Sequence, residues 1–291
     1  MLWEIDYPKY RFVGCNFKLT TQMTKLFLPL ATLVPILSFG QKITEADVQK
    51  VMLLSEQGKT NLALVTIDSL RKATKVKDEN YSMLIMTSAE LNMKAFNCEA
   101  AIRDNEELIK LLPDNEIDCQ THIAEFKKYI GDFEGALAAY KRILQINSSE
   151  EILYNNMASA YNSAGKYQDA IKILKVNPNT KISSLEYYNY AIAYFNLNKL
   201  DSAKQAMDKY LSTEDAENDF EAYKYAAQIY SALNDKKKSC ELITKATNIL
   251  TTNGTEEQIN KQPQKIKDYY FIKNALKEID ETKKLKAQFC D

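Results

Sequence analysis

The amino-acid sequence predicts an all-α protein built as a solenoid of about six helix hairpins, followed by a C-terminal helix. Composition is the first observation behind this prediction. Among 291 residues there are only seven Gly and six Pro, so residues that break helices are scarce. The second observation is internal repetition, because a Gly, an aromatic residue and a small residue recur in the same order along the chain.

The repeat is plainest in the middle of the chain, where residues 131–140 and 165–174 both read Gly-x-aromatic-x-x-Ala-x-x-x-large. Two antiparallel helices approach closely only where a side chain is small. The repeated small residue therefore marks the point at which the second helix of each hairpin crosses the first. This residue recurs six times, 33 to 38 residues apart, at Ala63, Ala101, Ala136, Ala170, Ala203 and Ser239.

The first helix of each predicted hairpin carries its own small residue, and a bulky residue lies four positions after each second-helix small residue. In the second copy the bulky position holds the polar Asn105, so this copy departs from the pattern. The six repeats cover residues 43–252; the two central copies match most closely and the first two least. The first-helix residues are Val51, Ala89, Ala124, Ala158, Ala191 and Ala227, and the bulky ones are Ile67, Asn105, Tyr140, Leu174, Met207 and Ile243.

This pattern resembles the tetratricopeptide repeat (TPR), whose core is a Gly turn, an aromatic, a small and a bulky residue at fixed offsets. Tyr154, Met157, Ala158 and Tyr161 fall where that family places its first-helix aromatic, Leu, small residue and Tyr. The resemblance implies a right-handed α-solenoid whose first helices line a concave groove and whose second helices form the convex side. It also implies a protein that binds other proteins. We expect the turn residues Gly58, Gly131 and Gly165 to adopt a left-handed backbone conformation.

The end of the chain, residues 262–291, has its own pattern. Pro263 precedes apolar residues that recur at helical spacing up to Leu285, with Lys and Glu between them. One amphipathic helix here would cover the apolar face that the last hairpin leaves exposed, as a solenoid requires. The alternative is a helix that stays undocked and binds a partner.

Helix periodicity and the family geometry together predict which side chains face the groove. Asn156 and Asn189 occupy equivalent positions, where related proteins often carry an Asn that hydrogen-bonds the backbone of an extended peptide. The groove lacks the Lys and Arg set of the subtype that clamps chaperone C-termini, so we expect a polar or aromatic peptide as its ligand; the alternative is solvated surface. The predicted peptide-binding residues are Asn155, Asn156, Ser159, Asn162, Tyr188, Asn189, Asn196, Tyr225 and Gln228. Further groove-facing positions are Thr121, His122, Glu125, Lys128, Ile192 and Lys224.

The N-terminus predicts export. An apolar stretch from Leu26 to Phe39 follows Lys25 and is too short to span a bilayer comfortably, but it suits a secretory signal at residues 23–40 with cleavage before Gln41. Residues 1–22 show no helical period and are interpreted as an upstream extension of a chain that starts at Met23. If the source is bacterial, the mature protein would then lie in the periplasm or cell envelope; the alternative is a eukaryotic secretory route. The alternative is an uncleaved signal that anchors the chain, which would be its one membrane contact.

Several classes of function are disfavoured by what the chain lacks. The net charge of −1 offers no attraction for nucleic acid. The chain has one His and five Cys without a CxxC pair, and Cys119 with His122 supplies too few ligands for a metal. We expect no catalytic residues, no cofactor and no small-molecule substrate. An exported chain could form a Cys98–Cys119 or another disulfide, but the spacing selects none. Cys240, beside Ser239, is interpreted as a packed rather than a reactive residue.

These observations lead to one expected function and one alternative. The chain is expected to be an exported scaffold that binds a protein or peptide partner in its concave groove. The alternative is an accessory subunit of a cell-envelope complex that docks through its convex face or C-terminal helix, without peptide recognition.

Overall fold

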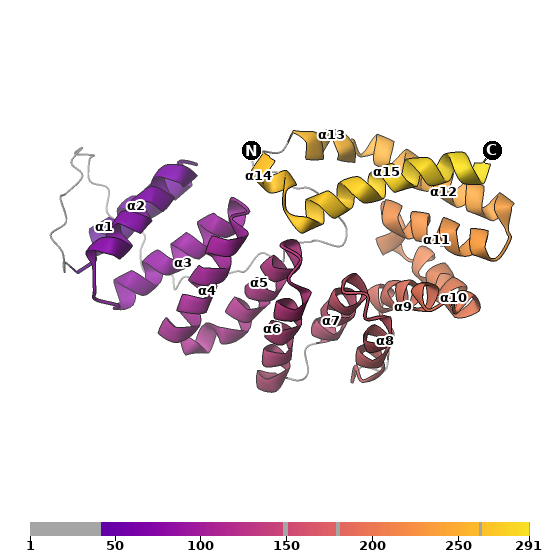
Figure 1. The fold of residues 1–291 in the computed structure, drawn as a ribbon. Helices are drawn as coiled ribbons and strands as arrows, with labels where there is room; N and C mark the ends of the chain where they lie inside the picture. The colour runs from indigo at the N-terminus through magenta and orange to yellow at the C-terminus, as the bar shows by residue number, and fades with distance from the viewer. Residues whose placement is uncertain (1–41, 148–150, 179–180, 262–263, 291) are drawn as a thin grey trace. The chain divides into compact units, whose positions relative to one another are not determined.

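The computed structural model describes residues 42–147, 151–178, 181–261 and 264–290, and none of these lies in a strand (Figure 1). The predicted signal peptide and upstream extension lie outside the described residues. The chain divides within α5 (Glu116–Tyr129) into an N-terminal unit, which ends at His122, and a C-terminal unit, which begins at Ile123.

The described residues confirm the predicted all-α fold with six helix hairpins, the third of which begins with α5. The N-terminal unit contains α1 (Glu45–Glu56), α2 (Thr60–Ala73), α3 (Glu79–Lys94), α4 (Cys98–Leu111) and the 3-10 turn Pro113–Asn115. The C-terminal unit contains α6 (Phe133–Ile146), α7 (Glu151–Ser163), α8 (Tyr167–Lys175), α9 (Ser184–Asn196), α10 (Leu200–Leu211), the 3-10 turn Glu214–Ala216, α11 (Phe220–Ala232), α12 (Lys236–Thr252), α13 (Thr255–Asn260), α14 (Gln264–Lys267) and α15 (Tyr270–Cys290).

The predicted crossing residues form the core of the hairpins. All six second-helix small residues, from Ala63 to Ser239, are at most 1% exposed, and the first-helix small residues are buried as well. Gly58, Gly131 and Gly165 have the expected positive φ of 70°, 84° and 72°. In the other three hairpins the same left-handed turn is made by residues other than Gly: Phe96, Asn198 and Asn234.

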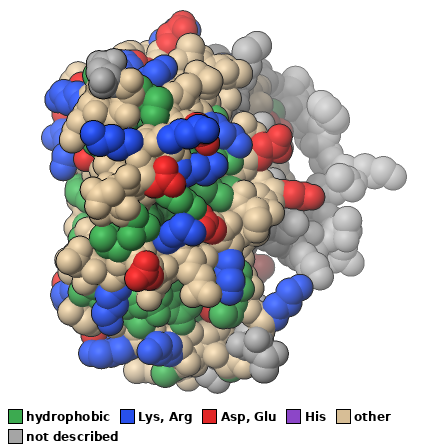
Figure 2. All heavy atoms as spheres, turned by 90° about the vertical axis from the view of Figure 1, so that its right-hand side faces the viewer, with side chains coloured by type: hydrophobic (Ala, Val, Ile, Leu, Met, Phe, Trp, Pro, Cys, Tyr) green, Lys and Arg blue, Asp and Glu red, His purple; other side chains and the backbone are tan. Residues whose placement is uncertain are grey.

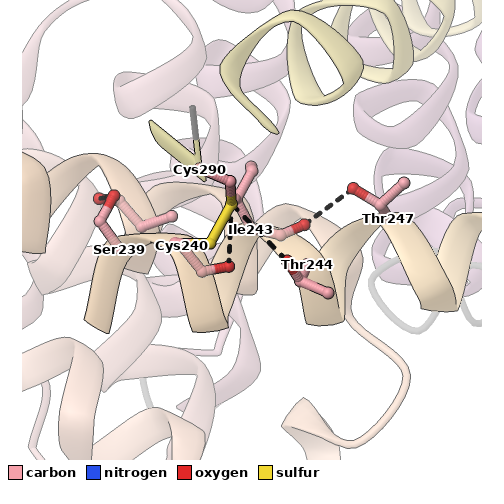
Figure 3. Close-up of a disulfide and its surroundings, with 7 residues drawn as sticks. Ser239, Cys240, Ile243, Thr244, Thr247 and Cys290 are labelled. Carbon is pink, nitrogen blue, oxygen red and sulfur yellow. Dashed lines mark hydrogen bonds between the residues drawn. A yellow bond between two sulfur atoms is a disulfide. The ribbon is translucent and has the colours of Figure 1, made fainter. Parts of the chain in front are cut away.

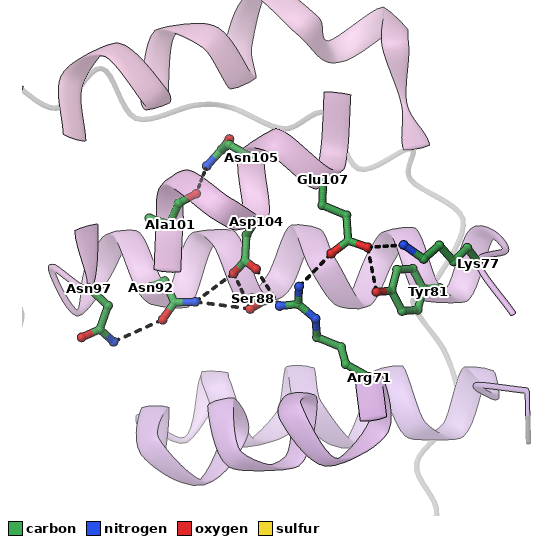
Figure 4. Close-up of polar contacts among 10 residues, drawn as sticks. All are labelled: Arg71, Lys77, Tyr81, Ser88, Asn92, Asn97, Ala101, Asp104, Asn105 and Glu107. Atoms are coloured by element: carbon green, nitrogen blue, oxygen red, sulfur yellow. Dashed lines mark hydrogen bonds and ion pairs between the residues drawn. The ribbon is translucent and has the colours of Figure 1, made fainter. Parts of the chain in front are cut away.

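The second repeat departs from the pattern because a polar network replaces part of its apolar core (Figure 4). Asp104 is 2% exposed and accepts hydrogen bonds from Arg71 at 2.6 Å, Ser88 at 2.6 Å and Asn92 at 2.9 Å. The neighbouring Asn105 is also buried and bonds within its own helix. A buried carboxylate is stable only when charge and hydrogen bonds compensate it, and this network supplies both.

The C-terminal segment corrects the prediction of a single helix over residues 262–291. The described part of that segment forms the short α14 and the longer α15, and α13 precedes both. As expected, α15 caps the last hairpin. Ile272, Ala275 and Ile279 of α15 are buried in the same apolar cluster as residues of α11 and α12.

Candidate protein-binding surface

The first helices of the C-terminal unit turn one side toward α15. Ser159 and Ser163 of α7 line a small pocket together with Tyr270 and Asn274 of α15. Further along the unit, Lys224 of α11 forms ion pairs with α15. The predicted groove side of α7 and α11 is therefore the side on which α15 lies.

A set of amide hydrogen bonds joins α7 to α9, the first helices of repeats four and five. The side chain of Asn155 donates to the Ser183 hydroxyl at 3.1 Å, and that of Asn189 donates to the Asn155 carbonyl at 3.3 Å. Asn162 donates to the carbonyl of Asn189 at 3.0 Å and to its side-chain oxygen at 3.3 Å. Asn155 and Asn189 are only 5% and 6% exposed. These amides therefore hold two neighbouring repeats together.

Three of the predicted groove amides have a side-chain oxygen that could still accept a hydrogen bond. The side-chain oxygens of Asn155, Asn162 and Gln228 are buried, and no group among the described residues donates a hydrogen bond to them. Leaving a buried carbonyl oxygen without a donor costs roughly 1–3 kcal/mol. An N–H group from a bound chain would remove that cost if the amide side chain rotated to meet it.

The two predicted tyrosines differ in their surroundings. The Tyr188 ring lies 5.1 Å from that of Tyr210, between ring centroids, and burial raises the pKa of its hydroxyl well above the usual range, helped by the charge of Glu221. Tyr188 is therefore neutral, and it packs half-buried against the apolar cluster. Tyr225 stacks edge-on against Phe195 and remains half-buried.

The remaining predicted residues stay at or near the surface. Asn156, Ser159, Asn162 and Gln228 are half-buried and Asn196 is exposed. We refer to the accessible set as the first-helix face: Asn156, Ser159, Asn162, Asn196, Tyr225 and Gln228. Whether Asn155, Tyr188 and Asn189 contact a ligand stays a prediction, since Asn189 would first have to leave its bonds to α7.

The groove positions of repeat three are engaged within the protein. Glu125 accepts a hydrogen bond from Tyr140 at 2.6 Å, and Lys128 lies 3.4 Å from the same carboxylate. In the N-terminal unit, His122 Nδ1 lies 3.2 Å from the side-chain oxygen of Asn105. His122 thus has a structural contact beside the second repeat.

Comparisons with known proteins agree with this architecture. A tetratricopeptide repeat protein from Parabacteroides merdae is similar over 85% of this chain and 98% of its own, with 14% identity and a TM-score of 0.56. The C-terminal part of a TPR repeat-containing protein from Cytophaga hutchinsonii is similar over 83% of this chain and 95% of its own, with 16% identity and a TM-score of 0.51. The family model "Tetratricopeptide repeat" matches residues 187–216, which run from α9 through α10. The chain therefore has the TPR fold, and residues 187–216 match the family's repeat.

MamA from Desulfovibrio magneticus RS-1, from its residue 41 to its end, shares the TPR fold over a smaller part of this chain. The similarity covers 61% of this chain and 98% of that one, with 15% identity and a TM-score of 0.51. At these identities the likeness to solved structures concerns the fold. A comparison with curated proteins found no match.

The long C-terminal helix α15 binds the last repeat through charge as well as apolar contact. Lys224, which is 1% exposed, forms ion pairs with Glu278 and Glu281 of α15, and Gln228 donates to Glu281 at 3.5 Å. Sequence reasoning predicted Lys224 and Gln228 as groove-facing residues but missed that α15 meets them. The available signal was the pair of Glu residues one turn apart in the last amphipathic stretch.

Both ends of α15 are fixed. At its start, the Tyr270 ring packs edge-on against Phe133, with 5.1 Å between centroids. At its end, Cys290 forms a disulfide with Cys240 of α12 (Figure 3). The hydroxyl of Thr244 lies 3.8 Å from the Cys290 sulfur and can donate to it. The interpretation of Cys240 as a merely packed residue was therefore wrong.

Of the helices in the described residues, none combines the length and apolar character needed to cross a bilayer. Within the same residues, no group of three or more His, Cys, Asp or Glu side chains is arranged to hold a metal ion.

Proposed function

We propose that this TPR protein is an exported scaffold that binds a partner protein through the first-helix face of repeats four to six. The observation that carries the proposal is the pair of amide oxygens on Asn162 and Gln228, two half-buried residues of that face, to which no described residue donates. A chain lying along these helices can offer backbone N–H groups to them once the amide side chains rotate toward the surface. The amide is suited to this role because it recognises a peptide unit regardless of side-chain sequence.

The charge of the C-terminal unit is compatible with a polar or aromatic ligand. On the side where α10, α11, α12 and the end of α15 lie, Lys and Arg side chains are spread among acidic and apolar ones (Figure 2). Such mixing produces no field of a single sign that would select a highly charged ligand. Half-buried Tyr225 adds an aromatic surface, and aromatic residues are enriched where proteins bind one another.

The cysteines support the proposed export. Disulfides persist in oxidising compartments and are rare in the reducing cytosol. The Cys240–Cys290 disulfide therefore suits a protein that residues 23–40 direct out of the cytoplasm, into the periplasm or cell envelope of a bacterium. Recovery of the natural protein from a cytosolic fraction, with both thiols reduced, would contradict this part of the proposal.

A specific observation also supports the alternative, an accessory subunit that docks through second helices. Leu62 and Val65 on α2 are 52% and 62% exposed, and they lie one helical turn apart. Exposed apolar residues that share a helix face are typical of permanent protein interfaces. This surface belongs to the N-terminal unit, so it can be altered separately from the first-helix face.

Quantitative affinity capture from the native cell-envelope fraction tests the proposal. The Asn156→Ala/Asn196→Ala variant should lose most of the protein captured by the unaltered chain, about fivefold for each hydrogen bond of roughly 1 kcal/mol. Lys141→Ala/Lys175→Ala, which alters exposed positions on second helices, serves as the matched control and should capture the same partner. If Leu62→Ser/Val65→Ser abolishes capture while the Asn variant retains it, the alternative replaces the proposal.

A further inference from the structure

The buried ammonium group of Lys224 constrains whatever lies on α11. Lys224 has 1% of its surface exposed, and its positive charge is compensated by Glu278 and Glu281, both of which belong to α15. Its Nζ atom also lies 4.4 Å from the centre of the Tyr225 ring. Removing the carboxylates would leave a cation in an apolar environment, which is strongly unfavourable. A helix that occupies this surface must therefore bring acidic side chains.

The docked side of α15 shows what kind of helix fits. Ile272, Ala275 and Ile279 are 2%, 5% and 2% exposed, and their spacing of three and four residues forms one apolar stripe. Glu278 and Glu281 lie beside this stripe, one turn apart, and face Lys224. The surface of α11 and α12 thus selects an amphipathic helix with an apolar stripe and two carboxylates three residues apart.

α15 is attached to the rest of the protein at both ends. Its first residue follows directly from the α13–α14 segment, and its last described residue, Cys290, is bonded to α12. A helix held at both ends leaves its site only with difficulty, because each end keeps the other at a high effective concentration. Opening the disulfide would leave one attachment.

We infer that the surface of α11 and α12 beneath α15 is a binding site for an acidic amphipathic helix of a partner protein. In this inference α15 is the resident occupant, and the Cys240–Cys290 disulfide keeps it in place. A dithiol reductant opens the site: it gives two electrons and two protons to the S–S bond, which becomes two thiols, while the dithiol becomes a disulfide. The inference goes beyond the proposed function, because it adds at repeat six a second ligand, a helix, of different chemistry.

Competition with a synthetic peptide tests the inference in the full chain. The probe is a fluorescent peptide with the sequence of residues 270–289, and binding is measured by anisotropy. In the Glu278→Gln/Glu281→Gln protein, α15 binds α11 and α12 more weakly. The peptide should therefore bind the reduced protein at least tenfold more tightly than the oxidised protein. A Cys290→Ser change in the same background should give the reduced behaviour without reductant. A peptide with Gln at both acidic positions should bind at least tenfold more weakly.

Hydrogen exchange of the unaltered chain provides a measurement that needs no variant. Reduction should speed amide exchange at residues 270–289 at least tenfold and leave α7–α10 unchanged. The inference fails if the amides of α15 stay equally protected from exchange, or if circular dichroism shows that the whole chain unfolds. The disulfide would then only stabilise the fold. A dimer that appears on reduction also overturns it, because α15 of a second copy would then be the occupant.

The peptide assay reports only on α15 and repeat six, so its failure is distinguishable from failure of the proposed function. If the oxidised and reduced proteins capture the same partner equally, the scaffold function stands and control by the disulfide falls. If the Asn156→Ala/Asn196→Ala change leaves capture intact, the scaffold proposal falls whatever the peptide does.

Discussion

Lys224 of α11 and Glu278 of α15 form an ion pair almost entirely out of solvent, with side chains 1% and 12% exposed. The two residues are far apart in the chain, and their pairing joins the last repeat to the C-terminal helix. The same pairing brings α15 onto a helix whose equivalents in repeats four and five carry the first-helix face. The predictions below concern this contact, the turn at Gly131 in the same unit, and the N-terminal unit.

Removing one member of this ion pair should be much more harmful than replacing both. Lys224→Ala leaves Glu278 uncompensated and should lower the free energy of unfolding by about 3–5 kcal/mol. Lys224→Met combined with Glu278→Leu should recover much of that loss, because an apolar pair needs no compensation. Urea denaturation followed by circular dichroism measures both. An equal loss in the single and double variants would show that the charges are not coupled.

The turn at Gly131 is expected to be less tolerant than the turn at Gly165. Both have positive φ, so Ala at either position should lower the free energy of unfolding by roughly 1–2 kcal/mol, the cost of a left-handed conformation for a residue with a Cβ atom. A Cβ atom on Gly131 would also lie 3.2 Å from the Tyr270 ring, whereas one on Gly165 meets nothing within 4 Å. Thermal unfolding should therefore show a larger loss for Gly131→Ala, accompanied by faster amide exchange at the start of α15. Equal losses would mean that Tyr270 does not pack on the turn.

The polar network of the second repeat should be essential to the N-terminal unit. Asp104→Ala leaves buried donors on Ser88 and Asn92 and should cost at least about 2 kcal/mol of unfolding free energy. Glu90→Ala, which removes an exposed carboxylate paired with Lys94, should change stability by no more than about 0.5 kcal/mol. Amide exchange of α3 and α4 compares the two variants. Similar exchange in both would show that the network is not structural.

The N-terminal unit should lose stability in acid through Glu107. Burial tends to raise the pKa of this carboxyl, but hydrogen bonds from Lys77 and Tyr81 and the charge of Arg71 bring it below its usual 4.5. A lowered folded-state pKa means that the stabilisation is complete above about pH 4.5 and is lost as the pH falls through the folded-state value. The urea concentration at the midpoint of unfolding should therefore decrease less between pH 6 and pH 3 for Glu107→Gln than for the unaltered protein. Parallel pH profiles would exclude Glu107 as the cause.

Most of the fold could be predicted because its signals are local. Small residues such as Ala170 mark helix crossings, and Gly165 marks the turn within the same short stretch of sequence. The turns at Phe96, Asn198 and Asn234 were harder to foresee, since these residues adopt a positive φ only when the packed hairpin requires it. Asn105 looked like a defect of the repeat because its explanation, the network around Asp104, spans three helices.

The candidate site could be predicted only in part. Helix periodicity identifies a side of α7 and α9, but it cannot show that Asn189 reaches across to Asn155 rather than outward. The contact of Lys224 with Glu278 and the Cys240–Cys290 disulfide join segments about fifty residues apart. No spacing rule within the sequence selects such pairs, because several docked positions of α15 would bury a similar apolar stripe.

The most direct test of the central claim, that partners bind the first-helix face, is site-specific photo-crosslinking in the native envelope. A photoreactive amino acid replaces either Asn196, which is exposed at the end of α9, or Lys172, which is exposed on the second helix α8. The account predicts a covalent adduct with a partner protein from position 196 and none from position 172. An adduct from position 172 alone would contradict it.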